Sequence, residues 1–492
     1  MTVQALTATP TSTSTNTVTL NTGTGNDKVT LSGTIGGVSN STTTSSTLKI
    51  NLGDGDDNLV VAGAIATDTY ATKAHAIDFG TGTDTLTFGT TSMDISGATL
   101  TGLEKIITSG TGILSVRASS VLGTSATTGT ELSIFSSGAG TVNLTAAPGS
   151  TGEVINGTLA FLTNTATVAT VLNETGNSGA DTITGSIGTD VITGNAGNDY
   201  LYGDNSGTKA VEAFKVSTNV DAQTMTAVLL GETITATSGA TAALSAAALN
   251  TAIQASTNYG KFYTSAVSTD TVSITYLVEG AQSDTVKIAS TGVINSGSTA
   301  TATAATNTVT GTTGTGGVDT IIGGVGADII AGGAGADKIA FATGSGTDLV
   351  LYGTADQFVF NETDFALPNV TGAGTFPAAT GNVAAGNYAE WANNATPAGV
   401  TATDVLLVES TTATYYADST AAILAYNVGT TTNDISTTAT LVVYATAANT
   451  YKIGYDSNGT TAGGETILAT VVGIPSASLL SSFASTDFLF SA

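Results

Sequence analysis

The feature that most constrains the fold is a nine-residue periodicity in two separate blocks of the chain. The first block begins at Gly176 and reads GNSGADTIT, GSIGTDVIT and GNAGNDYLY, followed by GDNSG. The second begins at Gly314 and reads GTGGVDTII, GGVGADIIA and GGAGADKIA. After Phe341 and Ala342 a degenerate copy follows, TGSGTDLVL. An internal repeat of this kind predicts a solenoid in which each repeat is one small structural unit.

Each position of the repeat has a physical reason. Glycine allows positive φ in a tight turn, aspartate ends the turn with a carboxylate, and the following x-U-x strand points one aliphatic side chain inward. If two nonapeptides form one coil, residues 18 apart stack, such as Asp181 on Asp199 and Asp319 on Asp337. Stacked carboxylates repel each other unless a cation lies between them.

Calcium is the cation that this pattern favours, because it accepts about six to eight oxygen ligands, including the carbonyls that glycine turns expose. A glycine-rich β-solenoid without metal is the alternative, but it leaves the repeating aspartate unexplained. The predicted calcium ligands of the two blocks are Asp181, Asp190, Asp199, Asp319, Asp328, Asp337 and Asp348, together with the turn glycines Gly179, Gly188, Gly197, Gly317, Gly326 and Gly335.

The two blocks resemble the repeats-in-toxin (RTX) family, whose repeat unit is GGxGxDxUx. The resemblance covers residues 176–205 and 314–353 and implies a parallel β-roll loaded with calcium. This chain departs from the unit at the second glycine of some copies, where Ser186 and Asn195 stand. It also often has alanine before the aspartate.

The N-terminal third carries looser relatives of the repeat, NTGTGNDKVTL, INLGDGDDNLVV and IDFGTGTDTLTF. Their final aspartates, Asp27, Asp57 and Asp84, are 30 and 27 residues apart, which fits the longer coils of a β-helix. Segments rich in Val, Leu, Ile and Thr lie between them and favour strands. We therefore predict an elongated parallel β-solenoid with calcium at some of its Gly-Asp corners.

The expected fold class is mainly β, a parallel β-solenoid and RTX β-roll with a small α+β insertion and a C-terminal β-rich unit. The expected domains are an N-terminal solenoid (1–175), a first roll block (176–205), an α+β insertion (206–310), a second roll block (311–353) and a C-terminal unit (354–492). Within the insertion, an Ala-rich segment predicts a helix near 240–256. One strand before it and two after it predict a β-α-β-β order.

The composition argues against several classes of ligand, metal site and enzyme. The chain has 37 Asp plus Glu against 11 Lys plus Arg, a net charge of -26, which argues against binding nucleic acid or anionic lipid. It has no cysteine and one histidine, His75, which argues against zinc, copper or haem sites. No metalloprotease, serine-hydrolase or nucleotide-binding motif is present. We therefore expect no catalytic residues, although a glycosidase needs only two carboxylates.

The ends of the chain predict export. The first residues, MTVQALTATP, lack the charged and apolar regions of a secretory signal peptide, and no apolar run is long enough for a transmembrane helix. The predicted hairpin with its turn at Asp456–Gly459 and the tail Asp487-Phe488-Leu489-Phe490 resemble the C-terminal unit of type I-secreted RTX proteins. That resemblance implies recognition by an ABC-type exporter.

The chain as a whole resembles the RTX-bearing surface-layer (S-layer) proteins of Gram-negative bacteria. The resemblance implies a structural protein at the extracellular cell surface that assembles with copies of itself into a lattice or filament. It also implies attachment to lipopolysaccharide or another surface glycan. A calcium-dependent adhesin or matrix protein is the first alternative, and a secreted polysaccharide-active enzyme is the second.

Overall fold

The computed structural model describes most of the chain in two compact units, residues 1–204 with 317–319, and residues 205–316 with 320–492. The described residues are 2–3, 16–31, 46–61, 76–122, 132–136, 140–149, 151–157, 160–164, 171–186, 188–203, 209–215, 224–230, 232–256, 258–279, 306–309, 317–342, 344–353, 355–361, 364–365, 381–382, 388–392, 405–409, 415–429, 439–447, 450–457, 465–473, 483 and 485–491. His75 and the end of the predicted turn at Gly459 lie outside them.

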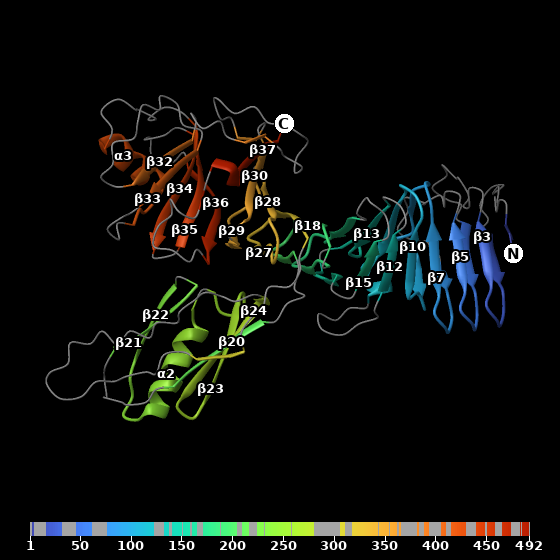
Figure 1. Cartoon of the computed structure of the whole chain (residues 1–492), viewed down its shortest axis with the longest axis horizontal. Helices are drawn as coiled ribbons and strands as arrows, with labels where there is room; N and C mark the ends of the chain where they lie inside the picture. The colour runs from blue at the N-terminus through green and yellow to red at the C-terminus, as the bar shows by residue number, and fades with distance from the viewer. Residues whose placement is uncertain are drawn as a thin grey trace. The chain divides into compact units, whose positions relative to one another are not determined.

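The first unit is a solenoid of parallel strands (Figure 1). One sheet contains β1 (Thr2–Val3), β3 (Lys28–Leu31), β5 (Asn58–Val61), β7 (Thr85–Phe88), β10 (Lys105–Thr108), β12 (Leu132–Ser136) and β15 (Ala160–Asn164). A second contains β2 (Asn16–Asn21), β4 (Ser46–Asn51), β6 (Ala76–Asp78) and β9 (Thr99–Thr101). This arrangement confirms the predicted fold class.

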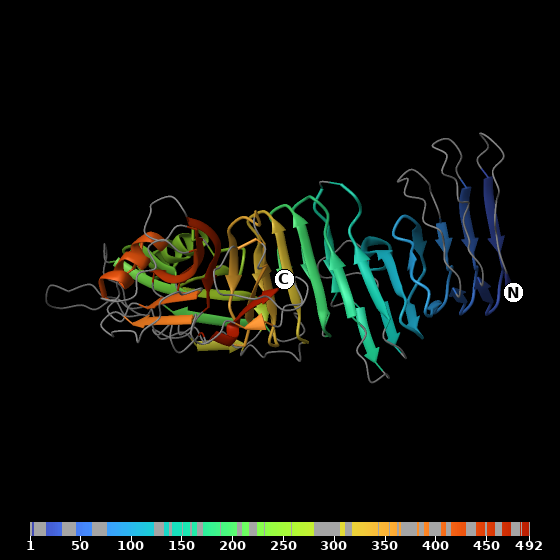
Figure 2. The ribbon, with the colours of Figure 1, turned by 90° about the horizontal axis from the view of Figure 1, so that it is seen from above.

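Two more sets of parallel strands continue this unit, and Figure 2 shows its successive coils from above. The first set contains β8 (Met93–Asp94), β11 (Ile113–Arg117), β13 (Thr141–Thr145), β16 (Val171–Thr175) and β18 (Asp190–Ala196). The second contains β14 (Val154–Asn156), β17 (Thr182–Thr184) and β19 (Tyr200–Tyr202). A short helix, α1 (Ala118–Val121), packs against β9 and β11.

The solenoid core follows from the alternation of apolar and polar residues along each strand. In β5 and β7 every second side chain is buried, and the residues between them are half-buried. Leu59 pairs with Leu86, and Leu86 pairs with Ile106 of the next coil, so that one aliphatic column runs through the coils. All three side chains are 0% exposed.

The strand register also confirms the predicted coil lengths. Lys28 pairs with Asn58, and Asn58 pairs with Thr85, which gives the long coils inferred from the N-terminal aspartates. In the first nonapeptide block Thr182 pairs with Tyr200, so that two nonapeptides form one coil.

The roll strands of the second unit are also parallel. One set contains β26 (Thr320–Val325), β28 (Lys338–Phe341), β30 (Gln357–Asn361) and β37 (Phe488–Ser491), with β31 (Gly381–Asn382) antiparallel to β37. The other contains β27 (Ile329–Ala331), β29 (Asp348–Leu351), β36 (Glu465–Val472), β35 (Thr450–Asp456), β34 (Thr440–Ala447), β33 (Val405–Glu409) and β32 (Tyr388–Ala392), with β35 antiparallel to β36 and β34.

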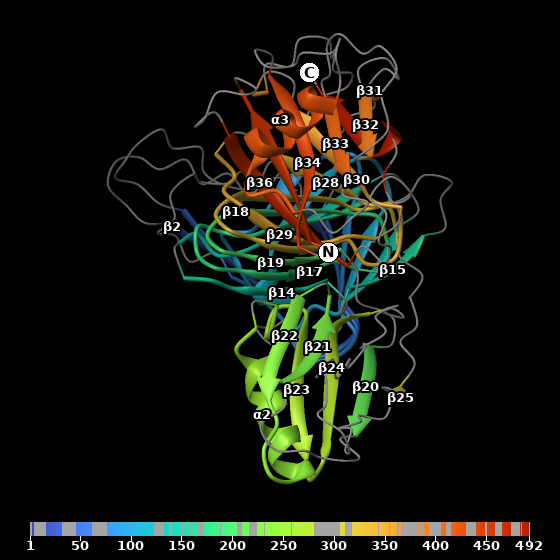
Figure 3. The same ribbon diagram turned by 90° about the vertical axis from the view of Figure 1, so that its left-hand side faces the viewer.

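A helix covers the sheet at the C-terminal end of the chain (Figure 3). Helix α3 (Ser419–Gly429) packs against β33, β34 and β35, and its Ile423 contributes to a core with Leu406 and Tyr444. Ser419 donates a hydrogen bond to the buried carboxylate of Asp456 over 2.7 Å, which ties the start of the helix to the sheet.

The insertion contains a helix and antiparallel strands. Its elements are β20 (Lys209–Lys215), β21 (Thr224–Leu229), β22 (Glu232–Thr237), α2 (Ala242–Gln254), β23 (Tyr263–Ser268), β24 (Thr271–Glu279) and β25 (Thr306–Val309). The predicted helix is confirmed, and Thr241 caps it by accepting a hydrogen bond from the Leu244 N–H. The strand expected before it is instead the hairpin β21–β22, because Leu230 turns the chain with φ 47°. With β20 and β25 added, the predicted β-α-β-β order is incomplete.

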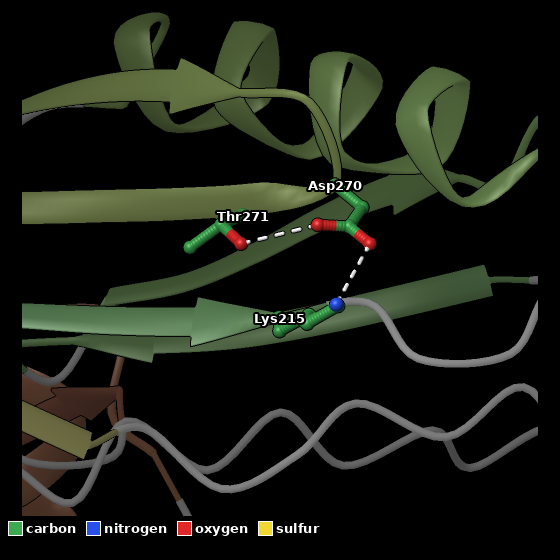
Figure 4. A network of polar contacts seen from close by, with 3 residues as sticks. All are labelled: Lys215, Asp270 and Thr271. Carbon is green, nitrogen blue, oxygen red and sulfur yellow. Dashed lines mark hydrogen bonds and ion pairs between the residues drawn. The ribbon is translucent and has the colours of Figure 1, made fainter.

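A surface ion pair joins β20 of the insertion to the turn between β23 and β24 (Figure 4). Lys215 Nζ lies 3.3 Å from Asp270 Oδ2, and Thr271 Oγ1 donates a hydrogen bond to the other carboxylate oxygen of Asp270. The Lys215 side chain is 58% exposed, so we expect this pair to contribute less than about 1 kcal/mol. The ion pair lies at the surface of the insertion, whereas the aspartates of the roll are buried.

Candidate calcium sites

The aspartates of the first block lie at the ends of their turns and are buried. Asp181, Asp190 and Asp199 are each 0% exposed. Asp181 Oδ2 accepts a hydrogen bond from the N–H of Asn177 in its own turn over 2.7 Å, and its Oδ1 accepts one from the Glu153 N–H of the preceding coil over 2.6 Å. Asp199 Oδ1 accepts in turn from the Asp181 N–H over 2.8 Å. We call such a series, in which each carboxylate receives the N–H of an acidic residue one coil earlier, an acidic ladder.

A second ladder links the two nonapeptide blocks across the insertion. Asp319 Oδ1 accepts the Asp190 N–H over 2.9 Å, although these residues are 129 apart in sequence. A Cβ atom at position 317 would collide with the carbonyl of Gly188, so Gly317 is stacked directly over Gly188. The sequence predicted stacking within each block and not this pairing, because the insertion separates the two partners along the chain.

The second block forms ladders of the same type. Asp348 Oδ1 accepts the Asp328 N–H over 3.0 Å, and Asp356 Oδ1 accepts the Asp337 N–H over 3.3 Å. The partners are 20 and 19 residues apart, so the extra residues between the copies lengthen these coils beyond 18. Asp356 was not predicted, since its segment ADQFVF has lost the glycines, although it keeps aspartate before an apolar strand.

The predicted turn glycines stack from coil to coil. Gly197, Gly326 and Gly335 have φ angles of 131°, 158° and 152°, a region that favours glycine. Cβ atoms at positions 197 and 346 would collide with the carbonyls of Gly179 and Gly326 below them. The turns therefore place rows of main-chain carbonyls beside the rows of aspartates.

The N-terminal aspartates form a ladder outside the nonapeptide blocks. Asp57 Oδ1 accepts the Asp27 N–H and Asp84 Oδ1 accepts the Asp57 N–H, both over 2.7 Å. Glu104 Oε2 then accepts the Asp84 N–H over 2.8 Å, so this glutamate, which the sequence did not single out, ends the ladder. The second carboxylate oxygens of Asp27, Asp57 and Asp84 are buried without a hydrogen-bond partner.

Burial disfavours the ionised form of two ladder carboxylates, Asp84 and Asp356. Burial raises the pKa of Asp84, against the lowering effect of the Asp57 N–H that it accepts. Burial, reinforced by the neighbouring charge of Asp337, raises the pKa of Asp356 from 3.8 to about 8. A bound divalent cation would reverse this shift by stabilising the ionised form.

The donor set fits calcium. Hard oxygen donors, from carboxylates and glycine carbonyls, are what calcium prefers, and buried carboxylate oxygens without partners need a ligand. Among the described residues, no three acidic or histidine side chains form a ready-made metal cluster. A bound ion would therefore combine few carboxylates with main-chain carbonyls.

Comparison with known families agrees with this donor set. Residues 175–206 and 313–348 match the RTX calcium-binding nonapeptide repeat, in four copies. The repeats imply that the chain binds calcium, and proteins with such repeats are typically secreted. No curated protein matches the chain. Within the described residues, no helix has the length and apolarity needed to cross a membrane.

Proposed function

We propose that this chain, which carries RTX calcium-binding repeats, is an extracellular structural protein that folds on binding calcium and then assembles with copies of itself as a surface layer. The observation that carries the proposal is the set of buried acidic ladders. With 11 Lys plus Arg for 37 Asp plus Glu, the cations of the protein are too few to neutralise its acidic residues.

Calcium-dependent folding follows from the cost of burying charge. Without calcium the ladder carboxylates must either repel each other or bind protons, and both oppose the compact roll at neutral pH. When calcium binds to the folded roll and not to the unfolded chain, its binding free energy becomes folding free energy. At the low free calcium of a cytosol the chain would stay unfolded, and it would fold outside the cell.

This order of events suits export by an ABC-type transporter that reads the C-terminal tail. In the folded protein the tail forms β37, which pairs with β30, and Phe488 and Phe490 are 0% exposed. A transporter that recognises this tail must therefore meet the chain before the roll folds.

Assembly into a layer is supported by the composition and by the architecture. The stacked coils form a regular scaffold whose surface is rich in Thr, Ser and Gly, and no motif for catalysis accompanies it. We propose a lattice or filament of identical copies as the main partner interaction. We also propose a surface glycan such as lipopolysaccharide as the attachment site.

Electron microscopy of the purified protein with calcium and with EGTA tests the proposal. We expect two-dimensional arrays or filaments with calcium and unfolded, unassembled chains in EGTA. On whole cells, EGTA should release the protein from the surface. A folded chain that remains a monodisperse monomer with calcium would favour an adhesin, and cleavage of polysaccharides would favour an enzyme; either result contradicts the layer.

A further inference from the structure

A buried glutamate interrupts the aliphatic core where the first nonapeptide block begins. Glu174 lies in β16 and pairs with Leu144 on one side and Ile192 on the other, so it stands between two buried aliphatic residues of the neighbouring strands. It is 0% exposed, and neither of its carboxylate oxygens has a hydrogen-bond partner. A buried carboxyl without partners is costly, so its presence here needs a ligand.

Close backbone packing brings a second oxygen donor near Glu174. A Cβ atom at position 157 would lie 2.7 Å from Glu174 Oε1 and 2.6 Å from the carbonyl oxygen of Thr184, so any side chain there would clash. Glycine at position 157 lets its backbone approach both oxygens. A carboxylate oxygen and a main-chain carbonyl oxygen therefore lie near each other, beside the same glycine.

Glu174 also stands where an acidic ladder would otherwise end. Leu172 pairs with Asp190, so the ladder of Asp190 and Asp319 has leucine, not aspartate, in the coil below. Glu174 follows two residues later on the same strand, and its longer side chain supplies a carboxylate to that coil. After burial, the charges of Asp190 and Asp319 are the main influences that raise its pKa well above the ordinary value.

Glu174 is not part of the nonapeptide unit, and it immediately precedes the residues matched to the repeat family. It also differs from Glu104, which lies at the later end of the N-terminal ladder and accepts the N–H of Asp84. Glu174 lies in the coil before Asp190 and accepts no hydrogen bond.

We propose that Glu174, with the Thr184 carbonyl and the carboxylate of Asp190, forms an additional calcium site that closes the end of the Asp190–Asp319 ladder. The inference rests on the proposed calcium-dependent folding and deepens it. A calcium ion at this place links the solenoid coil of β16 to the first coil of the nonapeptide roll, so that both coils are stabilised together.

The substitutions Glu174→Leu and Glu174→Gln test the site, because the two readings of this glutamate predict opposite effects. If the carboxyl has no ligand, leucine fits between Leu144 and Ile192, and Glu174→Leu raises the thermal midpoint in saturating calcium. If it binds calcium, both variants hold one calcium ion fewer per chain. Their thermal midpoints in saturating calcium then fall, and the calcium midpoint for folding rises by about ten-fold.

The charge control is Asp94→Asn, which removes an exposed carboxylate of the same unit and should change neither calcium count nor midpoint. Calcium bound per chain is counted by equilibrium dialysis with metal analysis, which does not depend on assembly. If Glu174→Leu does not fold, the calcium count of the near-isosteric Glu174→Gln decides. If the wild type folds with calcium and the variants bind the same number of calcium ions, the inference is wrong. If the folding of the wild type does not depend on calcium, the proposed function is wrong.

Discussion

Asp181 acts in its ladder both through hydrogen bonds and through its charge, and one substitution separates the two. Asp181 binds its own turn through Oδ2 and accepts the N–H of the preceding coil through Oδ1. Asparagine keeps one acceptor oxygen but carries no charge. Changing Asp181 to Asn therefore removes the charge that repels its neighbours and attracts calcium. It keeps the hydrogen bond between coils but loses the one within the turn, because the amide NH2 cannot accept the Asn177 N–H.

We expect the double variant Asp181→Asn with Asp199→Asn to shift folding in opposite directions with and without calcium. In EGTA the repulsion along the ladder decreases, so more β-structure should form than in the wild type. With calcium, the loss of two ligand charges should raise the concentration at the folding midpoint by about ten-fold or more. Circular-dichroism titrations measure both effects. Asp270→Asn, on the surface of the insertion, is the control, and a titration like that of the control would contradict these ligands.

The pKa of Asp356 predicts a pH dependence of the calcium-free fold. Its pKa is 3.8 ordinarily and about 8 when folded, so between these values the folded chain holds a proton that the unfolded chain has lost. Stability without calcium therefore falls as the pH rises from about 4 to about 8. We expect more β-structure in EGTA at pH 5 than at pH 8, and Asp356→Asn should weaken this difference. Equal pH profiles for the wild type and the variant would contradict the assignment.

At the residue scale, the sequence could identify the ladder aspartates but not all of their partners. The nine-residue period marks Asp181 and Asp199, and their stacking follows from the coil length. It cannot show that Asp190 meets Asp319, since loop length does not reveal where a chain returns. Asp356 and Glu174 were not predicted for another reason. The segment around Asp356 lacks the glycines of the repeat, and Glu174 stands at a strand position where the pattern has an aliphatic residue.

At the scale of the element, the stacked turns explain why glycine recurs at fixed places. Gly53 and Gly80 have φ angles of 97° and 95°, and a Cβ atom on either would collide with the glycine carbonyl of the coil below. The turns thus approach each other more closely than any side chain allows. The strands between them need only alternating apolar residues, which is why the sequence predicted the solenoid.

We expect Gly80→Ala to destabilise the N-terminal solenoid by about 2 kcal/mol or more, because it combines backbone strain with a collision against Gly53. Gly97→Ala is the matched control, since nothing lies within 4 Å of its Cβ position and its φ is not in the left-handed region. Thermal unfolding in saturating calcium compares the two. Equal midpoints would show that the turns can separate at little cost.

The insertion shows where patterns within elements are less informative. The Ala-rich helix was predictable from its composition, whereas the residues of β21 and β22 were predicted as one continuous strand. The turn between them depends on the positive φ of Leu230, a residue that gives no turn signal. Hairpins closed by such residues are decided by tertiary contacts.

At the scale of the whole molecule, the chain leaves the first unit after Asp204 and returns to it at Gly317–Asp319. Gly185 is covered by the carbonyl of Gly203, and Gly188 is covered by Gly317, so the chain resumes the roll at the position where it left. Joining Asn205 directly to Gly317 would give the sequence GDNGVDTII, a complete nonapeptide with Asp319 at its aspartate position. The residues between them are thus an addition to a roll whose register they leave unchanged.

We therefore expect a variant that lacks residues 206–316 to fold with calcium as the full chain does. The variant keeps Asp190 and Asp319, which share a hydrogen bond. Fewer residues then connect the two partners, which lowers the entropic cost of bringing them together. The calcium midpoint should stay within about two-fold of the wild type and unfolding should remain cooperative. A variant lacking 206–319 is the control, because it also loses Asp319 and shifts the register, and it should need more calcium. If the shorter deletion forms no β-structure at any calcium concentration while the full chain does, the insertion takes part in folding the roll, and the repeats do not form the array without it.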